Sequence, residues 1–191
     1  MNPFRRLALV AALAAALPAV AQDKQPTYEG YLCCNLRTDG SWISDINYAD
    51  GGKRVLAAGT PAKVTGYGRQ RVHVEIDGGK QSIGNDYSRD LDLAAFARRY
   101  VVTEDPRPRL AGWPAKVREA VAAAKVMRGM TREQVLMSVG YPVTSENPDL
   151  EAKLWRFWRS SFAEFQVGFD DRGRVAEITA DPATRNLVVM E

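Results

Sequence analysis

The sequence has little of the side-chain chemistry on which most catalytic and metal sites depend. Its 191 residues include one histidine and two cysteines. His73 alternates away from the apolar side of the stretch RVHVEI, which is typical of an ordinary surface histidine. No G-x-S-x-G nucleophile turn occurs, and the stretch DDRG, which begins at Asp170, lacks the ligand spacing and terminal glutamate of a calcium loop. We therefore predict no catalytic residue, no metal site and no cofactor, and a protein that is not an enzyme.

Long hydrophobic runs are also missing, apart from a short one at the N-terminus. Residues 1–21 contain Arg5 and Arg6, an apolar run of about 11 residues, and the small-residue triplet AVA before Gln22. A membrane-spanning helix needs about 20 apolar residues. The pattern predicts a secretory signal peptide over 1–21 and export to the periplasm, with association with the outer membrane as a further option. We expect no lipobox, because Cys33 lies well downstream of the apolar run.

An excess of charge of one sign is missing as well. The chain has 26 basic and 23 acidic residues, and removal of residues 1–21 takes away two arginines and no acid, which leaves a net charge of +1. Binding to a phosphate backbone needs a basic surface, so we expect no nucleic-acid partner. About 170 residues suffice for one ordinary domain or two small ones.

The two cysteines, Cys33 and Cys34, are adjacent, which leaves their redox state open. Neighbouring Cα atoms lie about 3.8 Å apart across a trans peptide, below the usual disulfide range of about 4.4–6.8 Å. Two separate strand thiols, at least one of them buried, are the favoured interpretation, and a vicinal or intermolecular disulfide is the alternative. A metal pair is disfavoured because adjacent strand side chains face opposite ways.

A proline-rich stretch divides the predicted mature chain in two. TEDPRPRLAGWP predicts a linker over 106–113, between domains at 22–105 and 114–191. In the first domain RVHVEI alternates with period two, and the glycine-rich stretches GYGRQ and DGGK are typical of turns. We expect about five strands and a short helix from about Asp92. The segment VLAAGTPAKVTGYGRQRVHVEIDGG resembles the bacterial SH3-like domain, which implies a small β-barrel.

Helix signals follow the linker. Apolar residues recur at helical spacing from Pro114 to Met127, before Gly129. Thr131 then begins a second helix with the capping-box sequence TREQ, and a glycine and a proline end that helix. These signals predict two helices.

Three strand-like runs come after the helices. They are KLWRFW at 153–158, EFQVGF at 164–169 and RVAEIT at 174–179, and the turn DDRG lies between the last two. Tight turns between neighbouring strands favour an antiparallel meander.

This ordered set of signals resembles the SmpA/OmlA (BamE-like) family. The matching positions are Gly129, Met130, Thr131, Gln134, Val135, Gly140, Pro142, Trp155, Phe157, Phe169, Gly173 and Val175. The resemblance covers about residues 115–180 and implies an accessory role in outer-membrane β-barrel assembly, with binding to a partner protein and to acidic phospholipid. The predicted fold class is therefore α+β: an N-terminal SH3-like barrel and a C-terminal BamE-like domain with two helices and a three-stranded antiparallel sheet.

Alternation within LWRFW suggests a candidate interaction surface. If Trp155 and Phe157 face the helices, Arg156 and Trp158 lie on the open face of the sheet. An exposed tryptophan beside an arginine is typical of an interface hot spot. Packing of Trp158 against the N-terminal domain is the alternative.

The predicted function is that of a non-enzymatic envelope adaptor that binds other envelope proteins, among them outer-membrane assembly components. Arg98 and Arg99, in the stretch ARRY, are a second candidate surface, for an anionic lipid or a glycan. A peptidoglycan-binding module and an inhibitor of a secreted enzyme are the alternatives.

Overall fold

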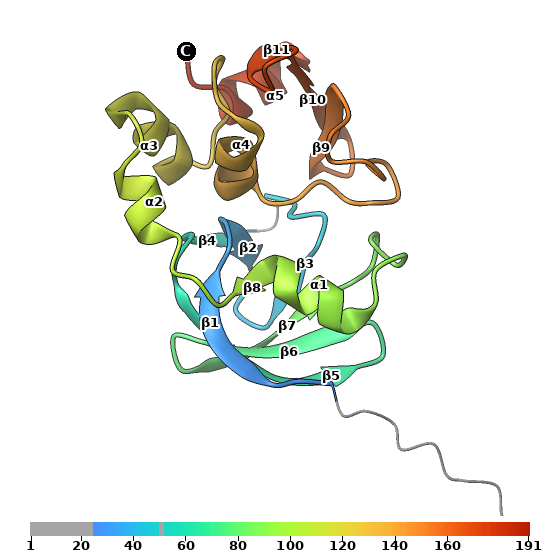
Figure 1. Cartoon of the computed structure of the whole chain (residues 1–191). Coiled ribbons are helices and arrows are strands. Elements are labelled where there is room, and N and C mark those ends of the chain that lie inside the picture. The colour runs from blue at the N-terminus through green and yellow to red at the C-terminus, as the bar shows by residue number, and fades with distance from the viewer. Residues whose placement is uncertain (1–24, 50–51) are drawn as a thin grey trace, which may run out of the picture.

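Two β-sheets and a set of short helices make up the structure, a computed structural model that describes residues 25–49 and 52–191. The larger sheet has the strand order β4-β2-β3-β7-β6-β5-β1-β8, and the smaller has the order β11-β10-β9. The larger sheet is curled and lies below the smaller sheet in Figure 1. The predicted signal peptide lies outside the described residues.

The larger sheet is a curled half-barrel of mixed direction. Its strands β3 and β7 pair in parallel, and its other neighbours are antiparallel. The strands are β1 (Tyr28–Leu32), β2 (Leu36–Thr38), β3 (Trp42–Ser44), β4 (Arg54–Leu56), β5 (Pro61–Gly68), β6 (Arg71–Ile76), β7 (Gly79–Gly84) and β8 (Val101–Val102).

The centre of this sheet is a meander of three strands, β5, β6 and β7. Along β6 the side chains of Val72, Val74 and Ile76 are buried, as their alternation predicts. Asp77 and Gly78 both have positive φ, 51° and 72°, in the tight turn between β6 and β7. The helix α1 (Leu93–Tyr100) packs into the same core, and β8 then returns to pair with β1.

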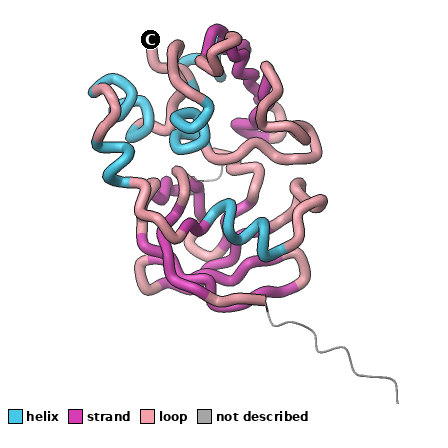
Figure 2. Tube along the Cα trace, viewed as in Figure 1, coloured by secondary structure: helices cyan, strands magenta, loops and turns pink. Residues whose placement is uncertain are grey.

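The second half of the chain surrounds a separate core. Its elements are α2 (Arg107–Ala111), α3 (Ala115–Ala122), α4 (Arg132–Val139), β9 (Leu154–Ser160), β10 (Ala163–Phe169), β11 (Val175–Ala180) and α5 (Pro182–Val188). Figure 2 shows the short helices beside the three-stranded sheet. Aromatic side chains of the sheet fill this core, and Trp155 has no exposed surface.

The capping box predicted at Thr131 is confirmed. The Thr131 hydroxyl accepts from the Gln134 N–H at 3.3 Å, and the Gln134 side-chain oxygen accepts from the Thr131 N–H at 2.9 Å. Gly140 follows the helix with φ of 87°, a conformation that favours glycine. The local signals around α4 therefore describe it correctly.

The first predicted helix is too long. It extends to Met127 in the sequence pattern, but α3 ends at Ala122. Ala124 has φ of 50°, and the Lys125 N–H donates to the Ala120 carbonyl at 2.9 Å, as in a Schellman helix end. Because alanine occupies the position where glycine is usual, the sequence does not signal this end.

The predicted fold class is wrong. The first half contains an eight-stranded mixed sheet in place of a five-stranded SH3-like barrel. The second half has four short helices around a three-stranded sheet, and this arrangement does not fit a BamE-like two-helix domain. Strands β2, β4 and β8 have only two or three residues each, too few to show a period of two, so the sequence pattern misses them.

The two halves meet at a seam of buried hydrogen bonds, which we define by Asn35 and its partners. The Asn35 side-chain amide donates to the carbonyls of Val121, at 2.6 Å, and Ser138, at 3.0 Å. Its side-chain oxygen accepts from the Ala58 N–H at 3.0 Å, and its own N–H donates to the Met137 carbonyl. One residue that follows β1 thereby holds α3 and α4 against the larger sheet.

Candidate interaction surfaces

The outer face of the smaller sheet has the arrangement predicted from its sequence. Trp155 and Phe157 are buried in the core, whereas Arg156 is exposed and Trp158 is half-buried on the opposite face. In the register of the sheet, Trp158 lies opposite Glu164. Arg156 and Trp158 thus lie on one face, as expected.

Trp158 is held at the edge of this face. Its indole N–H donates to Glu146 Oε2 at 2.8 Å. It also lines, together with Ile46 and Ala49 of the first half, a small cavity of about 20 Å³. Trp158 therefore lies against the first half of the chain, as in the alternative interpretation, and is only partly exposed.

The free edge of β9 is covered. The Asn147 side chain accepts from the Arg156 N–H at 2.8 Å and donates to the Arg156 carbonyl at 3.0 Å, as a neighbouring strand would. Ala49 donates its N–H to the Arg159 carbonyl at 3.0 Å. Edge strands with unpaired backbone groups recruit other strands, so these bonds at Arg156 and Arg159 disfavour the addition of a strand to β9.

Phe162 is an exposed aromatic residue that the sequence analysis missed. It lies in the turn between β9 and β10 with 99% of its surface exposed. It lines a shallow depression of about 300 Å³ with Glu164, Gln166 and Thr179. An aromatic residue in the serine-flanked turn SSFA is the sequence signal that could have identified it, because turns lie at the surface.

We call these outer residues the sheet-face surface: Arg156, Trp158, Phe162, Glu164, Gln166 and Thr179. Its charges are balanced, since Arg156 Nε lies 3.6 Å from Glu164 Oε2. At its rim, hydrogen bonds from Thr184 lower the pKa of Asp181. The surface therefore combines exposed aromatic area with nearly neutral polar groups.

Arg98 and Arg99 do not share the element of Arg156 and Trp158. They lie in the last turn of α1, where Arg98 is exposed. The Arg99 guanidinium lies 4.9 Å from the centre of the Tyr141 ring, and burial raises the pKa of Tyr141. Arg99 is thus engaged within the fold, and the predicted pair of free arginines reduces to Arg98.

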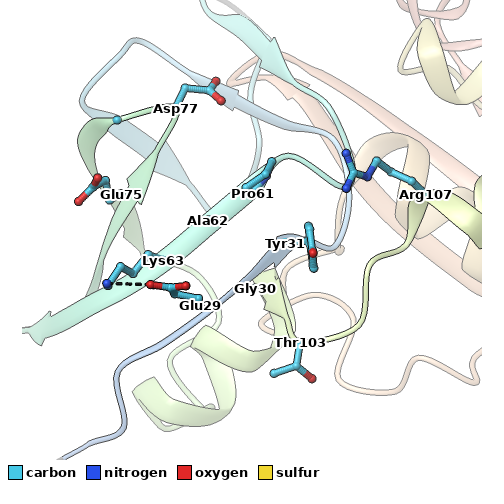
Figure 3. Close-up of a pocket in the computed structure, with 11 residues that line it drawn as sticks. Glu29, Gly30, Tyr31, Pro61, Ala62, Lys63, Glu75, Asp77, Thr103 and Arg107 are labelled. Carbon is cyan, nitrogen blue, oxygen red and sulfur yellow. Dashed lines mark hydrogen bonds and ion pairs between the residues drawn. The ribbon is translucent and has the colours of Figure 1, made fainter.

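A second hollow lies on the outer side of the larger sheet (Figure 3). It has a volume of about 850 Å³ and is open to solvent. Lys63 and Glu29 form an ion pair at 2.9 Å, which lowers the pKa of Glu29. Arg107 lies near the Tyr31 ring, 5.5 Å from its centre, and pairs with Asp105. Three acids, Glu29, Glu75 and Asp77, and two bases, Lys63 and Arg107, line this groove, so it presents charges of both signs and no single charge that would select a ligand.

The matched motif positions have structural roles. Gly129 and Gly173 adopt positive φ, 82° and 69°, in turns. Met130 and Trp155 are fully buried. These residues are explained by folding, and none of them adds a reactive group to a surface.

His73 is exposed, and its Nδ1 lies 3.0 Å from the Ser82 hydroxyl. Within residues 25–49 and 52–191, no group of three or more histidine, cysteine or acidic residues is arranged to hold a metal ion. Across the same residues, no helix is long and apolar enough to cross a membrane.

The two cysteines differ from the favoured prediction. Cys33 and Cys34 form a vicinal disulfide, so the interpretation as two separate thiols is wrong and the alternative holds. Both residues lie in the bend after β1 and not inside a strand. Because the alternation of strand side chains does not apply in a bend, the two sulfur atoms can meet.

No profile of a known protein family, no curated protein and no solved structure gives a significant match to this chain.

Proposed function

We propose that this protein is a non-enzymatic envelope adaptor that binds a partner protein through the sheet-face surface. The single observation that carries the proposal is Phe162, which is 99% exposed in the turn between β9 and β10. Exposing a large aromatic side chain to water costs about 1.5–3 kcal/mol relative to burying it. A partner that covers Phe162 would recover this free energy.

The chemistry of the surface favours a protein partner. Interface cores are enriched in tryptophan, phenylalanine and arginine and carry little net charge, and Trp158, Phe162 and the paired Arg156 supply this composition. The bonds that cover Arg156 and Arg159 on β9 disfavour a partner that adds a strand there and leave the face as the contact. The first partners to test are outer-membrane assembly components, to which the SmpA/OmlA resemblance points.

The test uses the intact secreted chain immobilised and exposed to an envelope extract. The variant is Phe162→Ala, which removes only exposed surface, and the matched control is Tyr87→Ala, an aromatic side chain with 44% exposure on the other half. A recovered protein is then purified, and its affinity for each form is measured by calorimetry. We expect Phe162→Ala to weaken binding about tenfold to a hundredfold and Tyr87→Ala to leave it unchanged.

Two results would count against the proposal. One is an extract from which wild type and Phe162→Ala recover the same proteins with equal affinity. The other is retention of all three forms on purified cell-wall sacculi with no protein partner, which would favour the peptidoglycan-binding alternative.

A further inference from the structure

The vicinal disulfide is accessible from outside the fold. Cys34 is 1% exposed, but Cys33 is half-buried. Both line a cleft of about 180 Å³ at the junction of the two halves, whose apolar wall includes Val102, Leu136 and Tyr141. A cavity of about 150 Å³ accommodates a molecule of the size of benzene, so a small thiol reagent fits this cleft.

The mouth of the cleft carries charge. Arg109 lies between two carboxylates, with Glu104 at 3.3 Å and with Glu133 in close contact. Two carboxylates and one guanidinium leave the mouth with one excess negative charge. A neutral dithiol therefore enters more readily than an anionic thiol.

The disulfide lies between two anchors of the fold. The Cys33 N–H donates to the Tyr100 carbonyl at 3.0 Å, and the Asn35 N–H donates to the Met137 carbonyl at 3.0 Å. The first bond ties the bend to the end of α1, and the second ties it to α4 across the seam. A change in the covalent bond of this bend therefore acts directly on the contact between the two halves.

We propose that Cys33–Cys34 is a site of thiol–disulfide exchange for a dithiol reductant and that its reduction loosens the seam. One thiolate of the reductant attacks the accessible Cys33 Sγ, the Cys33–Cys34 bond breaks, and the Cys34 thiolate leaves and takes up a proton. The second thiolate of the reductant then attacks the reductant's first sulfur, which is bonded to Cys33 Sγ in the mixed disulfide. This bond breaks, and the Cys33 thiolate is released and takes up a proton. The protein gains two electrons and two protons, and the dithiol becomes a disulfide.

The first experiment measures reduction of the folded, full-length chain by dithiothreitol. Thiols are trapped with N-ethylmaleimide, counted by mass spectrometry, and compared with unfolding followed by circular dichroism over a series of low urea concentrations. Exchange through the cleft gives two alkylated thiols at a rate that does not depend on urea while the chain stays folded. Thiols that appear only in step with global unfolding would overturn the proposal.

Variants separate the cleft from general accessibility. Leu136→Trp fills the cleft and is expected to slow reduction about tenfold, whereas Leu187→Trp, at an exposed leucine of α5, leaves the rate unchanged. Glu133→Gln keeps the side-chain shape and is expected to speed reduction by glutathione, an anionic thiol, more than reduction by dithiothreitol. Equal rates in all forms would refute access through this cleft.

The effect on the seam is read by hydrogen exchange. After reduction, and in a Cys33→Ser, Cys34→Ser double variant, peptides that contain the Asn35 amide should exchange about tenfold faster, because local opening costs less free energy. A peptide from β6 is the internal control and should not change. If the Asn35 amide exchanges at the wild-type rate both in the reduced protein and in the double variant, the disulfide does not control the seam.

Discussion

Replacing Asn35 by alanine tests whether one side chain holds the two halves together. The side chain is 3% exposed and makes three hydrogen bonds, two as donor and one as acceptor. After the substitution the Val121 carbonyl still accepts a hydrogen bond from the Ala124 N–H, at 3.0 Å. The substitution therefore leaves mainly the Ser138 carbonyl and the Ala58 N–H without a hydrogen-bond partner.

The magnitude follows from these groups. Each buried group left without a partner costs about 1–3 kcal/mol, and the lost bond to the Val121 carbonyl costs about 1 kcal/mol. The expected loss for Asn35→Ala is about 3–7 kcal/mol, a large part of the roughly 5–15 kcal/mol that stabilises a typical domain. Equilibrium unfolding in urea, followed by tryptophan fluorescence and circular dichroism, measures the free energy of unfolding.

Two controls make the test specific. Asn186→Ala, at an exposed position on α5, should change stability by less than about 0.5 kcal/mol. Asn35→Asp keeps the shape, but its carboxylate would face the carbonyls of Val121 and Ser138. Burial raises the pKa of such a group, so Asn35→Asp should regain stability as the pH falls and the side chain is protonated. If the free energy of unfolding of Asn35→Ala lies within about 1 kcal/mol of the wild-type value, the seam does not depend on this residue.

Three further substitutions test other features of the fold. Thr131→Ala removes half of the capping box and should cost about 1 kcal/mol in urea unfolding, so an unchanged midpoint would contradict the cap. Gly140→Ala should cost about 2 kcal/mol or more in the same assay, because φ is 87° and a Cβ would lie 2.9 Å from Asn47 Nδ2; a neutral effect would refute this reasoning. Burial raises the pKa of Asp45, so its contribution to stability is present below the unfolded pKa of about 4 and is lost as the pH rises through the folded value. Asp45→Asn should therefore gain stability relative to wild type from pH 4 to pH 7, and a difference that does not vary with pH would contradict this assignment.

Local sequence signals predict parts of this fold correctly where the physics is local. The capping box at Thr131 and the buried sides of β6 and β9 depend on residues a few positions apart. The end of α3 is missed because Ala124 adopts a positive φ without glycine. The parallel pairing of β3 with β7 joins residues about 40 positions apart, and no local pattern specifies it.

The candidate sites divide in the same way. Alternation places Arg156 and Trp158 on the open face, because a strand has a period of two. The disulfide at Cys33 and the exposure of Phe162 depend on a bend and a turn, where periodicity carries no information. The groove near Arg107 brings together residues of β1, β5 and β6, of the turn after β6, of a loop and of α2, so only the folded chain assembles it.

The polar residues at the seam explain why the two halves should not be treated as separable modules. Asn35, between β1 and β2, donates to carbonyls of α3 and α4, and Asn47, in the loop after β3, donates to the Val139 carbonyl at 2.9 Å. Separation of the halves would leave these carbonyls to water and would expose the apolar side chains behind them. A partner that binds the sheet-face surface and a reductant that acts at Cys33 would therefore act on one continuous structure. Reduction changes the support of α4, and α4 packs in the same core as the inner face of β9, whose outer face carries Arg156 and Trp158.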